Sequence, residues 1–223
     1  RPSGRIIKGH MAKTTAPILS FGAAGQIAKT QVYARWRGIP YARRYIVPAN
    51  PNTSAQVQTR SVFSWCQQVW KLMGANAQAP WTAYATGKPL TNRNAFTKFN
   101  VQALRSGTDL TAFIGSPGAG GGPPLAAFSA TGGSGSISTT VTVPDTPTGW
   151  TLAKVAAVAI VNDDPHTSTS YATTYAEATS TPWEPAFSGL AADAYIVSAW
   201  TVWTKPDGTT AYGPSLDHAA TVT

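Results

Sequence analysis

Acidic residues are missing from the first half of this chain. Residues 1–108 contain 15 lysines and arginines but no aspartate or glutamate, whereas residues 109–223 contain nine acids and only two bases, Lys154 and Lys205. The first half therefore carries about +15 charges and the second about −7, which add to the net charge of +8. Such a basic half must face something negative, which can be nucleic acid, an anionic surface or the acidic half of a neighbouring copy. Chemistry that needs paired carboxylates is excluded from it.

Cysteine and long apolar runs are also scarce. Cys66 is the single cysteine, so no internal disulfide can form, and stability must come from packing or from assembly. No run of 18 apolar residues occurs, which excludes a membrane-spanning helix, and without a charged-then-apolar leader we expect no secretory signal. Charged residues make up only 12%, against 20 glycines and 17 prolines. This composition favours a β-rich, loop-rich fold over a helical enzyme.

Recognisable catalytic motifs are absent as well. The run Gly118–Gly122 lacks the Lys-Ser/Thr of a phosphate-binding loop, and prolines follow it where a helix would begin. The group Asp163-Asp164-Pro165-His166 would need a further partner for a metal site, for which Asp217-His218 is the other candidate, and it is typical of a turn. No Gly-x-Ser-x-Gly elbow occurs, and Cys66 lies on the apolar stripe of a predicted helix, as a buried structural thiol would. We therefore expect a protein that is not an enzyme and that has no metal or cofactor.

Basic and aromatic residues are interleaved over residues 26–47. The alternation of residue types, with a turn at Gly38-Ile39-Pro40, predicts a β-hairpin. Arginine mixed with tyrosine and tryptophan suits phosphate contact with base stacking, and it equally suits a protein interface; a merely solvated face is the third possibility. We favour a protein interface. The partner-binding residues that we predict are Lys29, Tyr33, Arg35, Trp36, Arg37, Tyr41, Arg43, Arg44 and Tyr45 of the hairpin, with Arg60 and Lys71 of the helix that follows.

Helical periodicity begins after the hairpin. Apolar residues recur at spacings of three and four over 54–73, with Asn52, Thr53 or Ser54 available as a cap, so we predict an amphipathic helix that ends at Gly74. One further helical turn is expected at 80–84, with Pro80 in its first position. A second helix is expected at 92–105, with Phe96, Phe99 and Ala103 facing inward and Lys98, Gln102 and Arg105 facing out. The stripe of the first helix comprises Ala55, Thr59, Val62, Cys66, Val69 and Met73.

The remaining chain is rich in glycine and then in short β-like runs. Residues 115–124 are almost entirely glycine and proline, which favours a linker. The later runs, separated by turns such as Lys205-Pro206-Asp207-Gly208, indicate an antiparallel sandwich. Met11 resembles a natural start. We therefore predict an α+β chain with four parts: a tail or cloning remnant at 1–12, a basic anchoring domain of β-hairpin and helices at 13–114, a Gly/Pro linker at 115–124, and an acidic β-sandwich at 125–223.

The first half resembles a known group of proteins. Its pattern is a glycine-rich opening from Ser20, the basic hairpin with Gly38-x-Pro40, then Asn50-Pro-x-Thr53, Gln56 and Arg60-x-x-Phe63. This pattern, over roughly residues 17–105, resembles the start of poorly characterised proteins encoded in the structural regions of tailed phages and prophages. The resemblance implies a virion structural protein.

The second half resembles an immunoglobulin-like or fibronectin type III-like module. The segment Leu190–Tyr195 is similar to the turn into strand F with its corner tyrosine, and Tyr195–Trp200 is similar to that strand. After Asp207-Gly208, the segment Tyr212–Ser215 is similar to strand G. Such modules are common displayed domains on virion surfaces, which agrees with the phage resemblance.

Together these features predict a non-enzymatic virion protein, made in the cytoplasm of a bacterial host. We expect a capsid decoration or cement protein that docks through its basic half on the major capsid or tail tube protein and on copies of itself, forms an oligomer in the particle and uses no membrane. Three alternatives stay open: a tail structural protein, a basic nucleic-acid-binding protein, and a glycan-binding adhesion module. The last would stack sugars on Trp183, Trp200 or Trp203, of which the latter two alternate to opposite strand faces.

Overall fold

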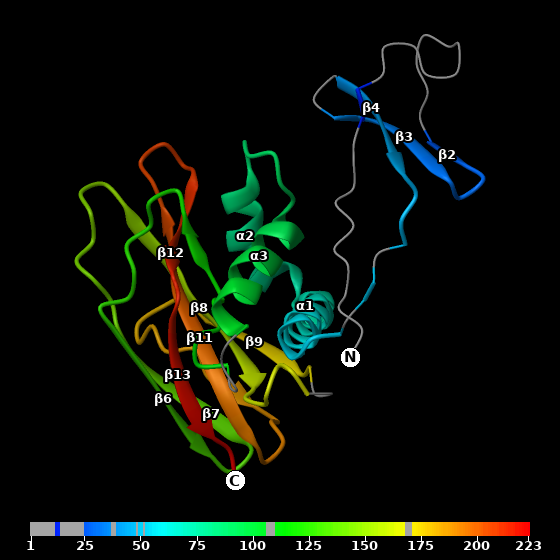
Figure 1. Ribbon diagram of the computed structural model, residues 1–223. Coiled ribbons are helices and arrows are strands. Elements are labelled where there is room, and N and C mark those ends of the chain that lie inside the picture. The colour runs from blue at the N-terminus through cyan, green and yellow to red at the C-terminus, as the bar shows by residue number, and fades with distance from the viewer. Residues whose placement is uncertain are drawn as a thin grey trace. The chain divides into compact units, whose positions relative to one another are not determined.

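The chain has an α+β fold with two compact units. A computed structural model describes residues 12–13, 25–36, 39–47, 49–50, 52–105, 110–167 and 171–223 (Figure 1). The two units are Arg1–Pro51, here called the hairpin unit, and Asn52–Thr223, here called the layered unit. Three helices and several antiparallel sheets confirm the predicted α+β class. No helix in the described ranges is both long and apolar enough to cross a membrane.

The hairpin unit contains one antiparallel sheet of four strands. Their order is β1-β4-β3-β2, and residues Gln31 to Trp36 pair in register with Arg44 to Ile39. The predicted hairpin is therefore confirmed, although its second strand begins at Ile39 and includes Pro40, which were expected in the turn. Ala28 and Lys29 adopt left-handed backbone angles in the turn before β3. The strands are β1 (Ala12–Lys13), β2 (Gly25–Ile27), β3 (Gln31–Trp36) and β4 (Ile39–Arg44).

Three helices form one side of the layered unit. α1 (Ser54–Leu72) and α3 (Asn92–Leu104) agree with the predicted helices. α2 (Ala75–Ala85) is longer than the single turn expected, because strongly helix-forming alanines precede Pro80 and Gly74 already caps the helix. On α1 the apolar stripe is buried from Val62 onward, whereas every residue from Ser54 to Arg60 is exposed.

Two antiparallel sheets complete the layered unit. The smaller has the order β10-β7-β6. The larger has the order β5-β12-β11-β8-β9, and β13 pairs with β11 beside β12. The strands are β5 (Pro117–Ala119), β6 (Ala127–Gly133), β7 (Ser136–Thr142), β8 (Thr151–Val161), β9 (Thr173–Ala178), β10 (Phe187–Ser188), β11 (Ala194–Thr204), β12 (Thr210–Pro214) and β13 (Leu216–Thr221).

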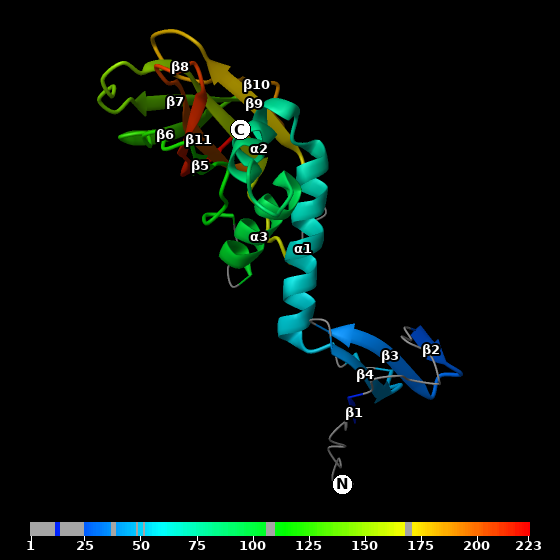
Figure 2. The same ribbon diagram turned by 90° about the horizontal axis from the view of Figure 1, so that it is seen from above.

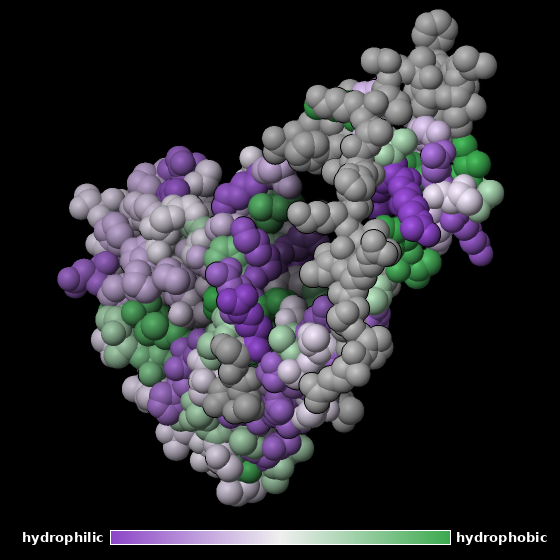
Figure 3. All heavy atoms as spheres, viewed as in Figure 1, coloured by the Kyte–Doolittle hydropathy of each residue, from purple (hydrophilic) through white to green (hydrophobic). Residues whose placement is uncertain are grey.

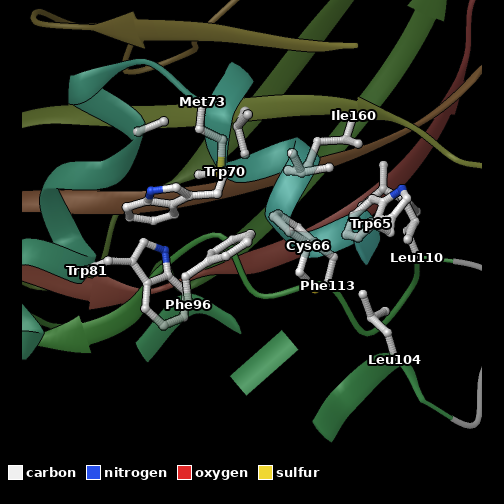
Figure 4. Close-up of a cluster of buried hydrophobic side chains, with 14 of the residues drawn as sticks. Trp65, Cys66, Trp70, Met73, Trp81, Phe96, Leu104, Leu110, Phe113 and Ile160 are labelled. Atoms are coloured by element: carbon white, nitrogen blue, oxygen red, sulfur yellow. The ribbon is translucent and has the colours of Figure 1, made fainter. Parts of the chain in front are cut away.

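The larger sheet is the middle of three layers, with the helices on one face and the smaller sheet on the other (Figures 1 and 2). Alternate residues of β8 divide between two cores, because successive side chains point to opposite faces. Val158 and Ile160 pack with the helices, while Val155 and Ala157 pack with the smaller sheet. The helix-side core is aromatic: Trp81 and Phe96 meet edge to face at 5.4 Å between ring centroids (Figure 4).

The glycine-rich segment 115–124, where a linker was predicted, contributes β5 to the larger sheet and packs closely against it. Gly115 is buried, and its N–H donates to Ser198 Oγ and Ser215 Oγ, both at 3.1 Å. A side chain at Gly122 would collide with the backbone of Tyr212. Glycine therefore serves close backbone packing here. Because the helices before this segment and the strands after it share one core, the division between units falls at Pro51 and not near residue 114.

Candidate functional site

The arginines of the hairpin unit lie on both faces of its sheet. Arg43 and Arg44 are exposed neighbours on β4, so their side chains point to opposite faces. Register pairs Arg44 with Gln31 and Arg35 with Pro40, which places Arg35 and Arg44 on one face. Lys29 is exposed in the turn before β3. The predicted cations thus make the sheet basic on two sides.

Tyrosines accompany the arginines on each face. Tyr33 lies between Arg35 and Arg44 on one face, and its hydroxyl donates to Gln31 Oε1 at 3.1 Å. Tyr41 shares the other face with Arg43. Both rings and that of Tyr45 are partly buried. Two predicted residues fall outside what the structure describes, namely Arg37 and the side chain of Trp36.

Arg60 and Lys71 belong to the layered unit and not to the hairpin unit. Both are exposed on α1. Arg60 Nη1 donates to Asn52 Oδ1 at 2.9 Å, and Lys71 Nζ donates to Gln68 Oε1 at 3.4 Å. The eleven predicted residues are therefore divided between two units.

Charge is distributed by unit and by layer. The hairpin unit holds nine of the 17 lysines and arginines and none of the nine acids, so the layered unit has eight bases and nine acids. Within the layered unit the helix layer has only bases, and Figure 3 shows hydrophilic residues over the helices. All six of these bases are exposed: Arg60, Lys71, Lys88, Arg93, Lys98 and Arg105.

A groove runs between α1 and α3, and sequence reasoning did not identify it. It has a volume of about 490 Å³ and is lined by Thr59 and Phe63 of α1 and by several residues of α3. A second hollow of about 410 Å³ shares Thr59. Helical periodicity did predict part of this groove, because it placed Lys98 and Arg105 on the outward face. The groove residues on this side are Asn94, Thr97, Lys98, Val101 and Gln102 of α3, with Arg105 directly after the helix.

The acids of the sheets are little neutralised by nearby bases. Lys154 Nζ lies 2.7 Å from Glu177 Oε2, and the Tyr175 hydroxyl donates to the same oxygen at 2.5 Å. Hydrogen bonds from Lys154 and then Tyr175 lower the pKa of Glu177. Among the described residues the one further pairing of this kind joins His166 Nδ1 to Asp164 Oδ1, at 3.3 Å. The other acids have no cation within ion-pair distance in the described ranges.

The side chains considered as catalytic or metal-binding candidates lie in a turn or in the core. Asp164 Oδ1 accepts a hydrogen bond from the backbone N–H of His166 at 2.8 Å, as in the predicted turn. No cluster of three metal-ligating side chains exists in the parts of the chain that the structure describes. Cys66 is fully buried, and burial raises the pKa of its thiol to about 12. A thiol with this pKa is protonated at neutral pH and is a poor nucleophile.

Cys66 is therefore expected to resist thiol reagents in the folded protein. At pH 8, labelling of native protein by a disulfide-exchange reagent should be at least about 100-fold slower than labelling in denaturant, because reaction waits for opening of the core. Stopped-flow absorbance checks this. Equal rates in both conditions would mean that the thiol is accessible.

Two of the three tryptophans proposed for glycan stacking are fully buried. Trp200 and Trp203 are both 0% exposed. As expected they lie on opposite faces: Trp200 packs with the helices, whereas Trp203 Nε1 donates to Pro123 O at 3.3 Å. Trp183 is partly buried against the core between the sheets. The prediction of a stacking platform is wrong for Trp200 and Trp203.

Comparison with protein-family models, with curated proteins and with solved structures found no match for this chain.

Proposed function

We propose that this chain is a non-enzymatic structural protein of a tailed-phage particle, acting as a capsid decoration or cement protein that docks through its hairpin unit. One observation carries the proposal. Of the described residues in the hairpin unit none is buried, and the sequence of the unit has bases but no acid. A small sheet without a core is at best marginally stable alone. The unit therefore needs a surface to cover it, and that surface must be negative.

The layered unit suits the displayed part of such a protein. In the lettering used for immunoglobulin-like sandwiches, β6 to β11 correspond to strands A, B, C, C′, E and F, and β12 with β13 corresponds to strand G. The smaller sheet then has the order A-B-E and the larger sheet the order C′-C-F-G. The Tyr195 hydroxyl donates to Ala191 O at 3.1 Å at the start of β11, as a corner tyrosine does at strand F. These features support the finer proposal of an immunoglobulin- or fibronectin type III-like module, with the helices as an added layer.

Docking of unlike surfaces suits assembly on a repeating lattice. A basic hairpin unit can bind an acidic shell protein or the acidic sheets of the next copy, and such head-to-tail contacts close rings or extend arrays. Exposed acids are available for the second arrangement, among them Asp145, Glu184 and Asp193. Many copies on one particle would make weak single contacts cumulative.

Charge reversal on the hairpin tests this function. Because Arg43 and Arg44 lie on opposite faces, the double variant Arg43→Glu/Arg44→Glu should impair docking through either face and reduce incorporation into particles at least tenfold. Phage lacking the chain would be complemented with each variant in the host. The particles would then be purified by density gradient and the chain quantified by mass spectrometry.

The matched control is Lys88→Glu/Lys205→Glu, which makes the same charge change in the layered unit. It should be incorporated as the unchanged chain is. Absence of the unchanged chain from purified particles, or normal incorporation of the hairpin variant, would overturn the proposal.

Nucleic acid is the second candidate partner, favoured by the tyrosines beside arginines on both faces of the hairpin sheet. Light scattering after size exclusion, repeated from low to high salt, distinguishes self-assembly from nucleic-acid binding. A salt-sensitive oligomer with a protein-like ratio of absorbance at 260 and 280 nm supports self-assembly. A high ratio that falls steeply with salt supports nucleic-acid binding, because each neutralised phosphate releases counterions.

A further inference from the structure

The groove between α1 and α3 combines an apolar centre with cations on one wall. Phe63 of α1 is 52% exposed although it is large and apolar, and it lines the groove together with partly buried Val101. Contiguous exposed apolar surface with a polar rim is a feature of interaction sites, and aromatic side chains are enriched as anchors at their centres. The helices are held together beneath it by the hydrogen bond from Gln67 Nε2 to Thr97 Oγ1, at 2.6 Å.

The cations of the groove are regularly spaced. Lys98 of α3 and Arg105, which caps the end of α3 with helical backbone angles, are both exposed and line the groove seven residues apart. Seven residues are two helical turns, so the two side chains share a face and start about 10.5 Å apart. Neither forms an ion pair with any residue in the described ranges. Asn94 and Gln102 lie on the same stripe and add amide groups that can bond a peptide backbone.

The charge of the surroundings limits what can fill the groove. No acid exists among residues 1–108, so nothing in the helix layer or the hairpin unit can neutralise these cations. The chain's own hairpin unit, with nine bases and no acid, is disfavoured as the occupant by like charge. A complementary occupant has carboxylates about 10 Å apart and an apolar side chain between them.

We propose that this groove binds an acidic peptide segment of another protein. An apolar side chain of the segment packs on Phe63 and Val101, and two carboxylates bind Lys98 and Arg105. The site extends the proposed function by a second docking surface, and it does not depend on the hairpin unit or on the partner being a virion protein. A peptide is favoured over nucleic acid because the centre of the groove is apolar and, among the described residues, only two cations line it.

Fluorescence anisotropy with a designed probe tests the site on the full-length chain. The probe is a labelled helical peptide with two glutamates two turns apart and one leucine midway. Two comparison peptides replace both glutamates by lysine, or the leucine by serine, and labelled oligothymidylate tests nucleic acid. We expect saturable binding of the probe that weakens with salt, and at least about tenfold weaker binding of either comparison peptide.

Variants of the chain locate the probe. Lys98→Glu/Arg105→Glu should weaken binding at least about 30-fold, and Phe63→Ser about tenfold. The matched control Lys88→Glu/Arg93→Glu makes the same charge change outside the groove, in the connection between α2 and α3 and in the first turn of α3, and should leave binding within about threefold. Lys98→Gln/Arg105→Gln should give an intermediate loss. Unchanged thermal unfolding by circular dichroism verifies that each variant is folded.

A variant of the hairpin unit distinguishes binding in the groove from docking through the hairpin unit. Arg43→Glu/Arg44→Glu should bind the peptide normally even though it is expected to fail in particle incorporation. No saturable binding of the probe, or equal losses in the groove and control variants, would overturn the inference. Tighter binding of oligothymidylate that depends on Lys98 and Arg105 would also overturn it, in favour of a nucleic-acid site.

Discussion

Replacing Gly132 by alanine is expected to lower the free energy of unfolding by about 3 kcal/mol or more. Gly132 lies in β6 of the smaller sheet, and a Cβ there would fall onto the carbonyl group of Thr221 in β13. That carbonyl belongs to backbone, so no rotamer change can relieve the collision. β13 in turn is held in register against β11 from Ala194 to Ala199. The two sheets must therefore separate where they now meet.

The adjacent glycine of the same strand provides the control. A Cβ at Gly133 would lie 3.2 Å from Ser136 Oγ, a side-chain atom that can rotate away. Gly133→Ala should therefore cost less than about 1 kcal/mol. Urea unfolding followed by tryptophan fluorescence measures both variants. Equal costs at the two positions would show that β6 and β13 are not as close as described.

Asp217 is expected to make the protein less stable at neutral pH than in mild acid. Burial raises the pKa of its carboxyl group from 3.8 to about 6, against the opposing effect of a hydrogen bond from Ser198. Its Oδ1 has no hydrogen-bond partner among the described residues. Because the folded protein holds this proton more tightly than the unfolded chain, the contribution is present below about pH 4 and is lost as pH rises to 6.

The substitution Asp217→Asn removes this dependence. A shift of about two pKa units corresponds to about 3 kcal/mol, and partial solvent access reduces this to about 2 kcal/mol. The variant should therefore be about 2 kcal/mol more stable than the unchanged protein at pH 7.5 and nearly equal at pH 3, below the pKa of the unfolded carboxyl group. Asp145→Asn, at an exposed acid, should change neither value by more than about 0.5 kcal/mol. Urea unfolding of the unchanged protein and of both variants at the two pH values measures these differences. A variant that is less stable at pH 7.5 would mean that the ionised carboxylate is favourably bound.

Local elements could be predicted from the sequence because local forces determine them. The period of apolar residues from Val62 to Val69 predicts α1, and alternation of residue types predicts the hairpin of β3 and β4. Both signals depend on residues a few positions apart. The sequence does not predict the start of α2, because Pro80 is typical of a first helical position and yet lies inside the helix.

The domain boundary could not be found from glycine content alone. Flexible linkers and tightly packed backbone both need glycine, and Gly115 and Gly122 are of the second kind. A better signal was present at Val155–Val161, where apolar residues are continuous and all are buried. A strand covered on one face alternates, whereas a continuous run indicates cover on both faces. That second cover is the helix layer.

The candidate groove depends on packing between residues far apart in the sequence, which local sequence patterns do not predict. Outward positions for Lys98 and Arg105 follow from helical period. Their meeting with Phe63 depends on how α3 crosses α1, and that is determined by the Gln67–Thr97 hydrogen bond and the shared core. Periodicity along one helix therefore predicts the exposed cations of the groove but not the position of Phe63 beside them.

The shared core of helices and strands has a consequence for how the protein is made. Trp65, Trp81 and Phe96 emerge from the ribosome long before Trp200 and Val202, against whose sheet they pack. Until β11 is complete, the helices carry an uncovered aromatic face, and contacts of such long sequence separation form slowly. A nascent chain halted before β11 is thus expected to bind chaperones and to be degraded. The layered unit becomes protease-resistant only when nearly all of the chain has been synthesised.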